Sequence, residues 1–106
     1  MPVIKIFTAQ PTPAQAAEAL AQDIEHLCLT LLRAQPTAIQ VLLVQALMVR
    51  GNPVLVEAHY RAQPYRDAEA LERFMDGVDH SVQQHLGEQP RIRCFAVDQA
   101  GLSARH

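Results

Sequence analysis

The chain contains no tryptophan and only two cysteines among its 106 residues. Cys28 and Cys94 both lie in apolar stretches, so we expect two buried free thiols in a reducing compartment rather than a disulfide framework. No apolar run reaches the roughly 18 residues that a membrane span needs, and the N-terminus lacks the pattern of a signal peptide. These absences predict a cytoplasmic protein with no membrane partner.

An excess of basic charge is missing as well. The net charge is -2 and the isoelectric point is about 6.2, which argues against a nucleic-acid partner. The five histidines show no compact spacing with cysteines or carboxylates, so we expect no metal, and nothing indicates another cofactor. A hydrophobic content of 49% is ordinary for a globular protein, and the length fits one domain spanning residues 1–106.

The first half of the chain has the pattern strand, helix, strand. Residues 3–8 are β-rich, and Thr12 is expected to cap a helix that has Pro13 at its first position and Gln15 completing a capping box. Pro36 ends that helix. Residues 39–49 are β-branched and apolar on both faces, which predicts a strand buried on two sides.

The second half repeats this order after a turn at residues 50–53. Residues 54–61 are expected to form a strand, and a second amphipathic helix is expected to begin after Asp67 and to end at Gly87. Residues 92–97 form the last expected strand.

The two halves also match in sequence, as an internal repeat of about residues 2–49 and 53–100. Pro2-Val3-Ile4 corresponds to Pro53-Val54-Leu55, Ala9-Gln10-Pro11 to Ala62-Gln63-Pro64, and Gln35-Pro36 to Gln89-Pro90. Each half is predicted to form a right-handed parallel β-α-β unit. The expected fold class is therefore α+β, with a duplicated β-α-β unit, a four-stranded mixed sheet and two helices on one face.

The other face of this sheet needs a partner. Both faces of the strand at 39–49 are apolar, and only one can contact the helices. Exposing such a surface costs about 25 cal/mol per Å². We therefore expect an oligomer that covers this face.

The residue after the initiator methionine is Pro2. Methionine is normally removed before a small residue, and a terminal proline is a secondary amine that can accept a proton. An α-amino group has a pKa of about 7.7 to 8.0, and burial or nearby arginines would lower the pKa of a prolyl amine toward neutrality. A base poised near the working pH suits proton transfer at carbon.

With Met1-Pro2-Val3-Ile4-Lys5-Ile6 at its start and two β-α-β units of matching length, the chain resembles the tautomerase superfamily over nearly its whole length. The duplicated members include macrophage migration inhibitory factor and the carboxymethyl-hydroxymuconate isomerases. The resemblance implies a homotrimer whose sheets form a central barrel, and an amino-terminal proline, here Pro2, as catalytic base.

The resemblance also implies a small carboxylate substrate held by arginines near the proline. Arg61 and Arg66 fall in the region where some members carry them, and Arg93 and Phe95 occupy the last strand, where members place pocket residues, often from a neighbouring subunit. The loop Ala9-Gln10-Pro11 carries no arginine, and neither does the start of the second strand. This argues against an oxalocrotonate-type activity.

Three functions follow as hypotheses. The favoured one is an isomerase that moves a proton in a small unsaturated 2-hydroxy or 2-oxo acid, with Pro2 as general base. The second is the dehalogenase, hydratase or decarboxylase chemistry of the same superfamily, which needs a protonated proline and a group that activates water. The third is a non-catalytic ferredoxin-like ligand-binding module, because that fold has the same order of elements.

Overall fold

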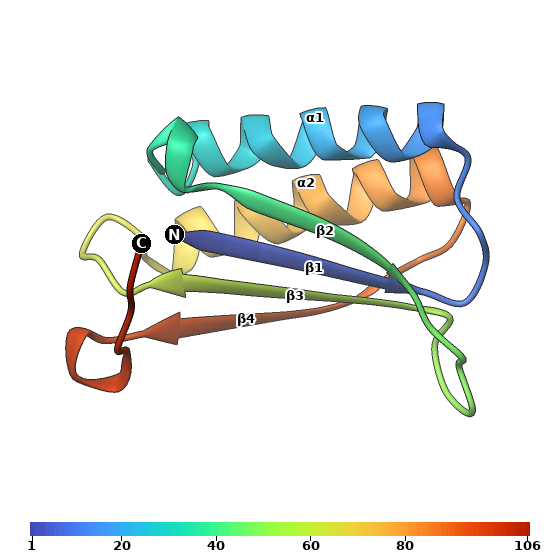
Figure 1. The fold of residues 1–106 in the computed structure, drawn as a ribbon. Coiled ribbons are helices and arrows are strands. Elements are labelled where there is room, and N and C mark those ends of the chain that lie inside the picture. Colours follow the sequence, from blue (N-terminus) through green and yellow to red (C-terminus); the bar gives the residue numbers. More distant parts are fainter.

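The computed structural model describes residues 1–106 as a four-stranded sheet with two helices on one face (Figure 1). The elements are β1 (Pro2–Thr8), α1 (Ala14–Thr30), β2 (Gln40–Gln45), β3 (Val54–Arg61), α2 (Ala68–Leu86) and β4 (Arg91–Val97), with short 3-10 turns at Pro36–Ala38 and Gln99–Gly101. The expected α+β class and the mixed sheet are confirmed.

The order of strands in the sheet is β2-β1-β3-β4. β1 pairs with β2 in parallel, β3 pairs with β4 in parallel, and the two central strands, β1 and β3, are antiparallel. Both strands of each β-α-β unit are therefore direct neighbours. A ferredoxin-like sheet splits its β-α-β units, so the ferredoxin-like fold of the third hypothesis is wrong, whereas its non-catalytic binding role remains untested.

Both helices appear as expected, but one predicted cap does not. The Asp67 side chain accepts a hydrogen bond from the Ala70 amide at 2.9 Å at the start of α2, and Gly87 ends the helix with φ 71°. At α1 the N-cap is Pro13 and no side chain caps the helix, so the prediction for Thr12 and Gln15 is wrong. The helix begins one residue later than expected, which places Thr12 outside the capping position.

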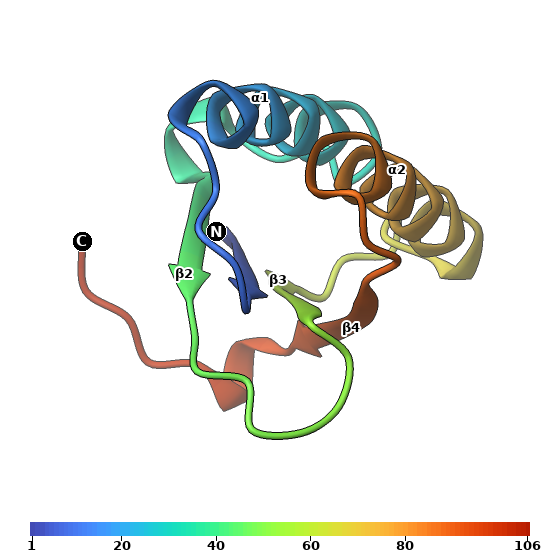
Figure 2. The same ribbon diagram turned by 90° about the vertical axis from the view of Figure 1, so that its right-hand side faces the viewer.

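The core lies between the sheet and the helices (Figure 2). Alternate residues of β1 and β3 face the helices and are buried. The buried apolar side chains of the helices are Leu20, Ile24 and Cys28 of α1 and Phe74, Val78 and Val82 of α2. Cys28 is buried as expected, whereas Cys94 is only half-buried. Tyr60 is in the core, and burial raises the pKa of its phenol above the ordinary value.

The strand predicted at residues 39–49 is shorter than expected and lies at the sheet edge. β2 ends at Gln45, and the apolar residues beyond it extend from the sheet, with Leu47 92% and Val49 84% exposed. The prediction that β2 is buried on two sides is wrong for the single chain, because Leu42 remains 42% exposed on the face away from the helices. The apolar run contained no signal for where pairing with β1 stops.

The sheet face away from the helices has a mixed composition. One row across it joins Leu42, Lys5, Glu57 and Arg93 through the strand register. The next row contains Phe95, whose ring stacks on that of His59 at 4.7 Å. His59 also lies 3.5 Å from the carboxylate of Glu57. The face is therefore less uniformly apolar than β2 alone suggested.

Neither helix combines the length and the hydrophobicity that crossing a bilayer requires. No group of three or more histidine, cysteine, aspartate and glutamate side chains is arranged to hold a metal ion.

Candidate active site

Pro2 lies at the end of the sheet where the two central strands meet three connecting segments (Figure 1). It pairs with Tyr60 near the end of β3, and both side chains are fully buried on the helix-facing side of the sheet. The loop after α1 and the turn before α2 come together at the same end. The strand pairing thus brings the start of the chain to residues more than thirty positions away in sequence.

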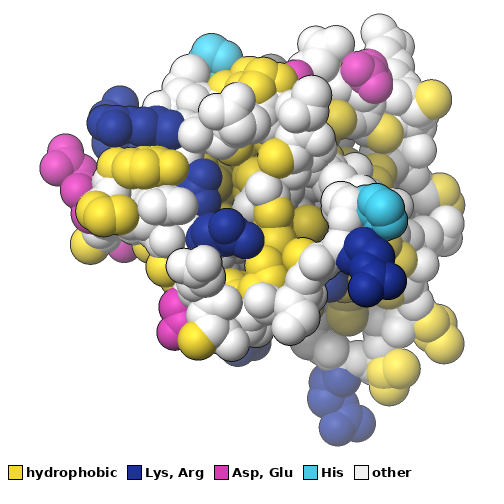
Figure 3. Space-filling view, turned by 60° about the vertical axis from the view of Figure 1, so that its left-hand side comes forward, with side chains coloured by type: hydrophobic (Ala, Val, Ile, Leu, Met, Phe, Trp, Pro, Cys, Tyr) yellow, Lys and Arg dark blue, Asp and Glu magenta, His cyan; other side chains and the backbone are white.

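A cavity of about 280 Å³ opens at this end. Its lining residues come from the N-terminus, from the loop after α1, and from the segment between β3 and α2: Met1, Arg33, Ala34, Gln35, Ala38, Arg61, Gln63, Tyr65 and Arg66. Figure 3 shows this end of the molecule, where basic side chains surround a hollow with hydrophobic side chains on its floor. While Met1 is attached, Met1 lines the cavity and Pro2 is buried behind it with an amide nitrogen.

The pKa of the Met1 amino group shows how the surroundings affect an amine at this end of the chain. Burial, followed by the charges of Arg66 and Arg61, lowers the pKa of the Met1 amino group below its ordinary value. All three causes disfavour an added positive charge. A prolyl amine exposed by loss of Met1 would begin one residue deeper, beside the same guanidinium groups.

Arg66 is largely committed to the protein itself. Its Nε donates to the Leu32 carbonyl at 2.7 Å, and its Nη1 donates to the Arg61 carbonyl at 2.7 Å. The first bond ties the segment before α2 to the loop that follows α1, and the second ties it to the end of β3. Arg66 therefore shapes the cavity as well as adding charge, and only one of its terminal nitrogens remains free of these bonds.

Arg61 is exposed at the end of β3, and its guanidinium makes no hydrogen bond or ion pair within the chain. It lines the cavity, so its donors are available to a bound anion. Of the residues predicted from the sequence, the structure brings Arg61 and Arg66 together around the entrance to Pro2.

Arg33 was not predicted from the sequence, yet it lines the same cavity. Its φ is 51°, a left-handed conformation that residues other than glycine rarely adopt. The internal repeat marks this position as unusual, because Gln35-Pro36 corresponds to Gln89-Pro90 and Arg33 therefore corresponds to Gly87. One half of the chain uses the residue that suits the backbone, and the other half keeps a guanidinium there at some conformational cost.

Arg93 and Phe95 do not line the cavity of their own chain. Both lie on β4 and are exposed on the sheet face away from the helices, where the Arg93 Nη1 donates to the Ile92 carbonyl at 2.8 Å and Phe95 contacts His59. A role for either residue at Pro2 would require a neighbouring subunit, and it remains a prediction.

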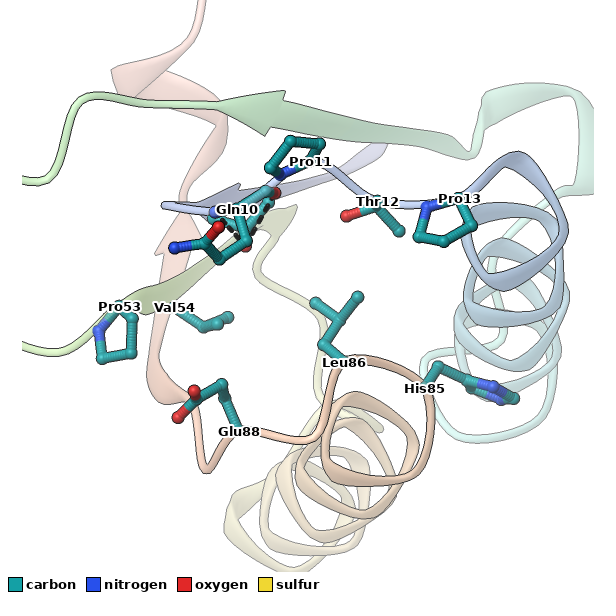
Figure 4. Close-up of a pocket in the computed structure, with 10 residues that line it drawn as sticks. Gln10, Pro11, Thr12, Pro13, Pro53, Val54, His85, Leu86 and Glu88 are labelled. Atoms are coloured by element: carbon teal, nitrogen blue, oxygen red, sulfur yellow. Dashed lines mark hydrogen bonds between the residues drawn. The ribbon is translucent and has the colours of Figure 1, made fainter.

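A second cavity, of about 120 Å³, lies at the opposite end of the sheet around Pro53 (Figure 4). Through the internal repeat it is the counterpart of the first cavity. Thr8 takes the place of Arg61, Thr12 that of Tyr65, and Pro13 that of Arg66. No arginine or lysine lines it. His85 and Glu88 line it, but its proline nitrogen is an internal amide that cannot accept a proton, so of these two cavities only the one at Pro2 can combine a terminal proline amine with arginines.

No family model matches the sequence, and no curated protein does either. Solved structures of closely similar fold do exist. The fused 4-OT described as an asymmetric trimer superposes with a TM-score of 0.83 at 11% identity, over 96% of this chain and 91% of that chain. Pt0534 inactivated by 2-oxo-3-pentynoate gives a TM-score of 0.80 at 12% identity, over 96% and 90% of the two chains.

Macrophage migration inhibitory factor from Toxoplasma gondii superposes with a TM-score of 0.78 at 12% identity, over 96% of this chain and 95% of that chain. At this identity the similarity establishes the fold. The chain thus has the fold that its sequence resemblance predicted, that of the tautomerases.

Proposed function

We propose that the chain is an isomerase of the tautomerase type, in which Pro2 becomes the general base once Met1 has been removed. The observation that carries the proposal is the place of Pro2: the first residue of a central strand, directly behind a cavity lined by three arginines. The tautomerase fold supports it. The counterpart cavity at Pro53 supports it by contrast, since no arginine lines it and the nitrogen of Pro53 is an internal amide that cannot accept a proton.

The proposed substrate is a small 2-hydroxy-2-enoic or dienoic acid, or the enol of a 2-oxo acid. Arg33 and Arg61 have guanidinium groups free of hydrogen bonds and ion pairs, and both line the cavity. A guanidinium presents a planar pair of donors that matches a carboxylate. The free nitrogen of Arg66 adds a third positive charge near the developing enolate, which favours a transition state carrying negative charge.

In the proposed reaction the Pro2 nitrogen takes the proton of the enol hydroxyl and becomes a secondary ammonium. The C2–O bond becomes a carbonyl, the electrons of the double bond form a new C–H bond at C3 or C5, and the ammonium supplies that proton. Atoms and charge balance without a cofactor. The field that lowers the pKa of the Met1 amine would likewise keep part of the prolyl amine unprotonated near neutral pH.

The alternative dehalogenase, hydratase or decarboxylase chemistry needs a group that activates water. No carboxylate lines the cavity of the single chain, and Glu57 lies on the other face of the sheet beside His59. A pH–rate profile separates the two hypotheses. A free-base proline gains activity as pH rises through the pKa of its amine, and Arg61→Ala should move this rise to higher pH because one lowering charge is lost.

The experiment that tests the proposal starts with the intact mass of the mature protein, which should lack methionine. Ketonisation of the enol of phenylpyruvate should then be measured for the wild type and for Pro2→Ala. We expect activity to fall by at least a hundredfold, consistent with the loss of a general base. Retained methionine, or full activity in Pro2→Ala, would show that this mechanism is wrong.

We further propose that the chain forms a homotrimer. Leu42, Val44 and Phe95 are each between 38% and 42% exposed on the outer sheet face, and the extension at Leu47 and Val49 is almost fully exposed. One of the structures with this fold is described as a trimer. Light scattering should give three times the chain mass of 11.8 kDa, and a monodisperse monomer would contradict the proposal.

A further inference from the structure

Tyr65 separates two cavities at the proline end of the molecule. It lines the cavity at the N-terminus, and it also lines a neighbouring cavity of about 240 Å³ on the side of α2. Arg33 is the only other residue shared by both linings. The second cavity is polar, and its other lining residues are Thr30, Leu31, Asp67, Glu69, Ala70 and Arg73.

Two guanidinium groups contact the Tyr65 ring. The Arg33 Cζ lies 5.0 Å from the ring centroid, and the Arg66 Cζ lies 5.5 Å from it. Both distances fall within the range of a cation–π contact, each of which is worth about 0.5–1 kcal/mol at an exposed site. The ring is half-buried and its hydroxyl makes no hydrogen bond within the chain.

The backbone under Tyr65 is fixed as well. Residues 63–66 form a turn in which the Arg66 amide donates to the Gln63 carbonyl at 3.0 Å, with Pro64 at the second position, where its fixed φ suits the turn. Asp67 follows at once as the cap of α2. Arg66 ties the turn to α1 through Leu32. The partition is therefore a rigid part of the fold rather than a mobile side chain on a loop.

We propose that Tyr65 is the specificity-determining residue of the proline cavity, limiting it to short acids by closing it off from the polar cavity beside α2. The inference rests on the proposed function for its substrates, but the partition itself rests on the shared linings and the ring contacts. Removal of the ring would join the two cavities. The enlarged site would then accept 2-oxo acids whose longer chains end in a hydrogen-bonding group, because the second cavity offers carboxylates, a hydroxyl and a guanidinium.

The test uses a length series of 2-oxo acids that end in a primary amide, with four, five and six carbons. Exchange of the C3 protons for deuterium, followed by NMR, reports enolisation for every member. Calorimetry gives the dissociation constant of the same acids. Both measurements are made on the mature wild type, Tyr65→Ala, Tyr65→Phe and Pro2→Ala.

In Tyr65→Ala we expect the preference for the six-carbon over the four-carbon acid to rise at least tenfold, in exchange rate and in affinity. Tyr65→Phe keeps the ring and should retain the wild-type preference. An unchanged preference in Tyr65→Ala would overturn the partition. If the wild type exchanges the C3 protons no faster than Pro2→Ala does, the proposed function is wrong. The dissociation constants from calorimetry would then still decide whether Tyr65 limits the length of the bound acid. If Tyr65→Ala does not fold, Tyr65→Leu, which shortens the side chain but keeps it apolar, takes its place with the same expectations.

Discussion

Arg33 offers a way to separate binding from stability, because its backbone favours a different residue. At φ 51° a side chain costs about 1 kcal/mol, a cost that glycine does not incur. Glycine adds about 0.5–1 kcal/mol of backbone entropy to the unfolded state. Loss of the contact with Tyr65 removes about 0.5–1 kcal/mol. These contributions nearly cancel, so Arg33→Gly should change the free energy of unfolding by less than about 1 kcal/mol.

The effect on ligand binding should be much larger. A hydrogen bond to a charged group contributes about 1.5–3 kcal/mol, and each 1.4 kcal/mol is tenfold in affinity, so the dissociation constant of a 2-oxo acid should rise about 10- to 150-fold. The enol substrate should show this mainly in KM, because the carboxylate is bound equally in the ground state and in the transition state.

Two variants serve as controls for Arg33→Gly. Arg33→Ala also removes the guanidinium but keeps the left-handed strain, so it should bind as weakly as Arg33→Gly and be no more stable. Arg50→Ala removes an exposed arginine between β2 and β3, away from the cavity, and should leave binding unchanged. Urea unfolding and calorimetry measure the two quantities. Unchanged affinity in Arg33→Gly, or a stability loss above about 2 kcal/mol, would refute the reasoning.

Three further predictions concern the helical layer. Gly77→Ala places a Cβ 2.5 Å from the Leu27 Cδ2, so it should destabilise the wild type by about 1–2 kcal/mol but stabilise a Leu27→Ala background by up to about 1 kcal/mol. Urea unfolding of the wild type, the two single variants and the double variant measures both effects, and additive effects would contradict the prediction. Hydrogen bonds from Ser81 at 2.8 Å and from His85 at 3.0 Å lower the pKa of Asp23 despite the opposing effect of burial. The ionised Asp23 carboxylate therefore stabilises the folded state. This contribution is complete above the unfolded-state pKa of about 4 and is lost as pH falls through the lower pKa of the folded state. Asp23→Asn should therefore lose about 1 kcal/mol at neutral pH and show a flatter acid limb of stability; an equally steep limb would count against it. Burial raises the pKa of the Cys28 thiol to about 12 and also raises that of Cys94. Mass spectrometry should therefore find both thiols unmodified by iodoacetamide at pH 8 in the native protein and alkylated in urea. Rapid labelling of Cys28 in the native protein would contradict its burial.

The elements of the fold were predictable because each has a local cause in the sequence. The helical stripes, the Asp67 cap and the glycine after α2 act within a few residues, and the repeat gave the pairing of each β-α-β unit. The end of β2 was not predictable in the same way. Its apolar run continues to Val49, whereas pairing stops at Gln45 because β1 ends at Thr8.

The site was predictable only in part. Arg61 and Arg66 were expected only from the family resemblance, at the end of β3 and before α2. The hydrogen bonds of Arg66 to the Leu32 and Arg61 carbonyls depend on how distant segments meet, which no local pattern records. Arg33 could have been found from the repeat, since it occupies the place of Gly87. Its place at the cavity was not predicted because a sequence alone does not show which residues have a positive φ.

The difference between the two cavities follows from the covalent chemistry of proline. Duplication of a β-α-β unit gives two equivalent cavities, but a chain has one amino terminus, so only one proline nitrogen can become a base. At the other cavity the proline nitrogen is an inert amide, so arginines there would have no proline base to assist. The residues at the places of Arg61 and Arg66 there are Thr8 and Pro13, which are uncharged. The hydrogen bonds of Arg66 give that residue a structural role, whereas the guanidinium groups of Arg33 and Arg61 make no such bonds, and the proposed catalytic role of Pro2 would account for their place at this cavity.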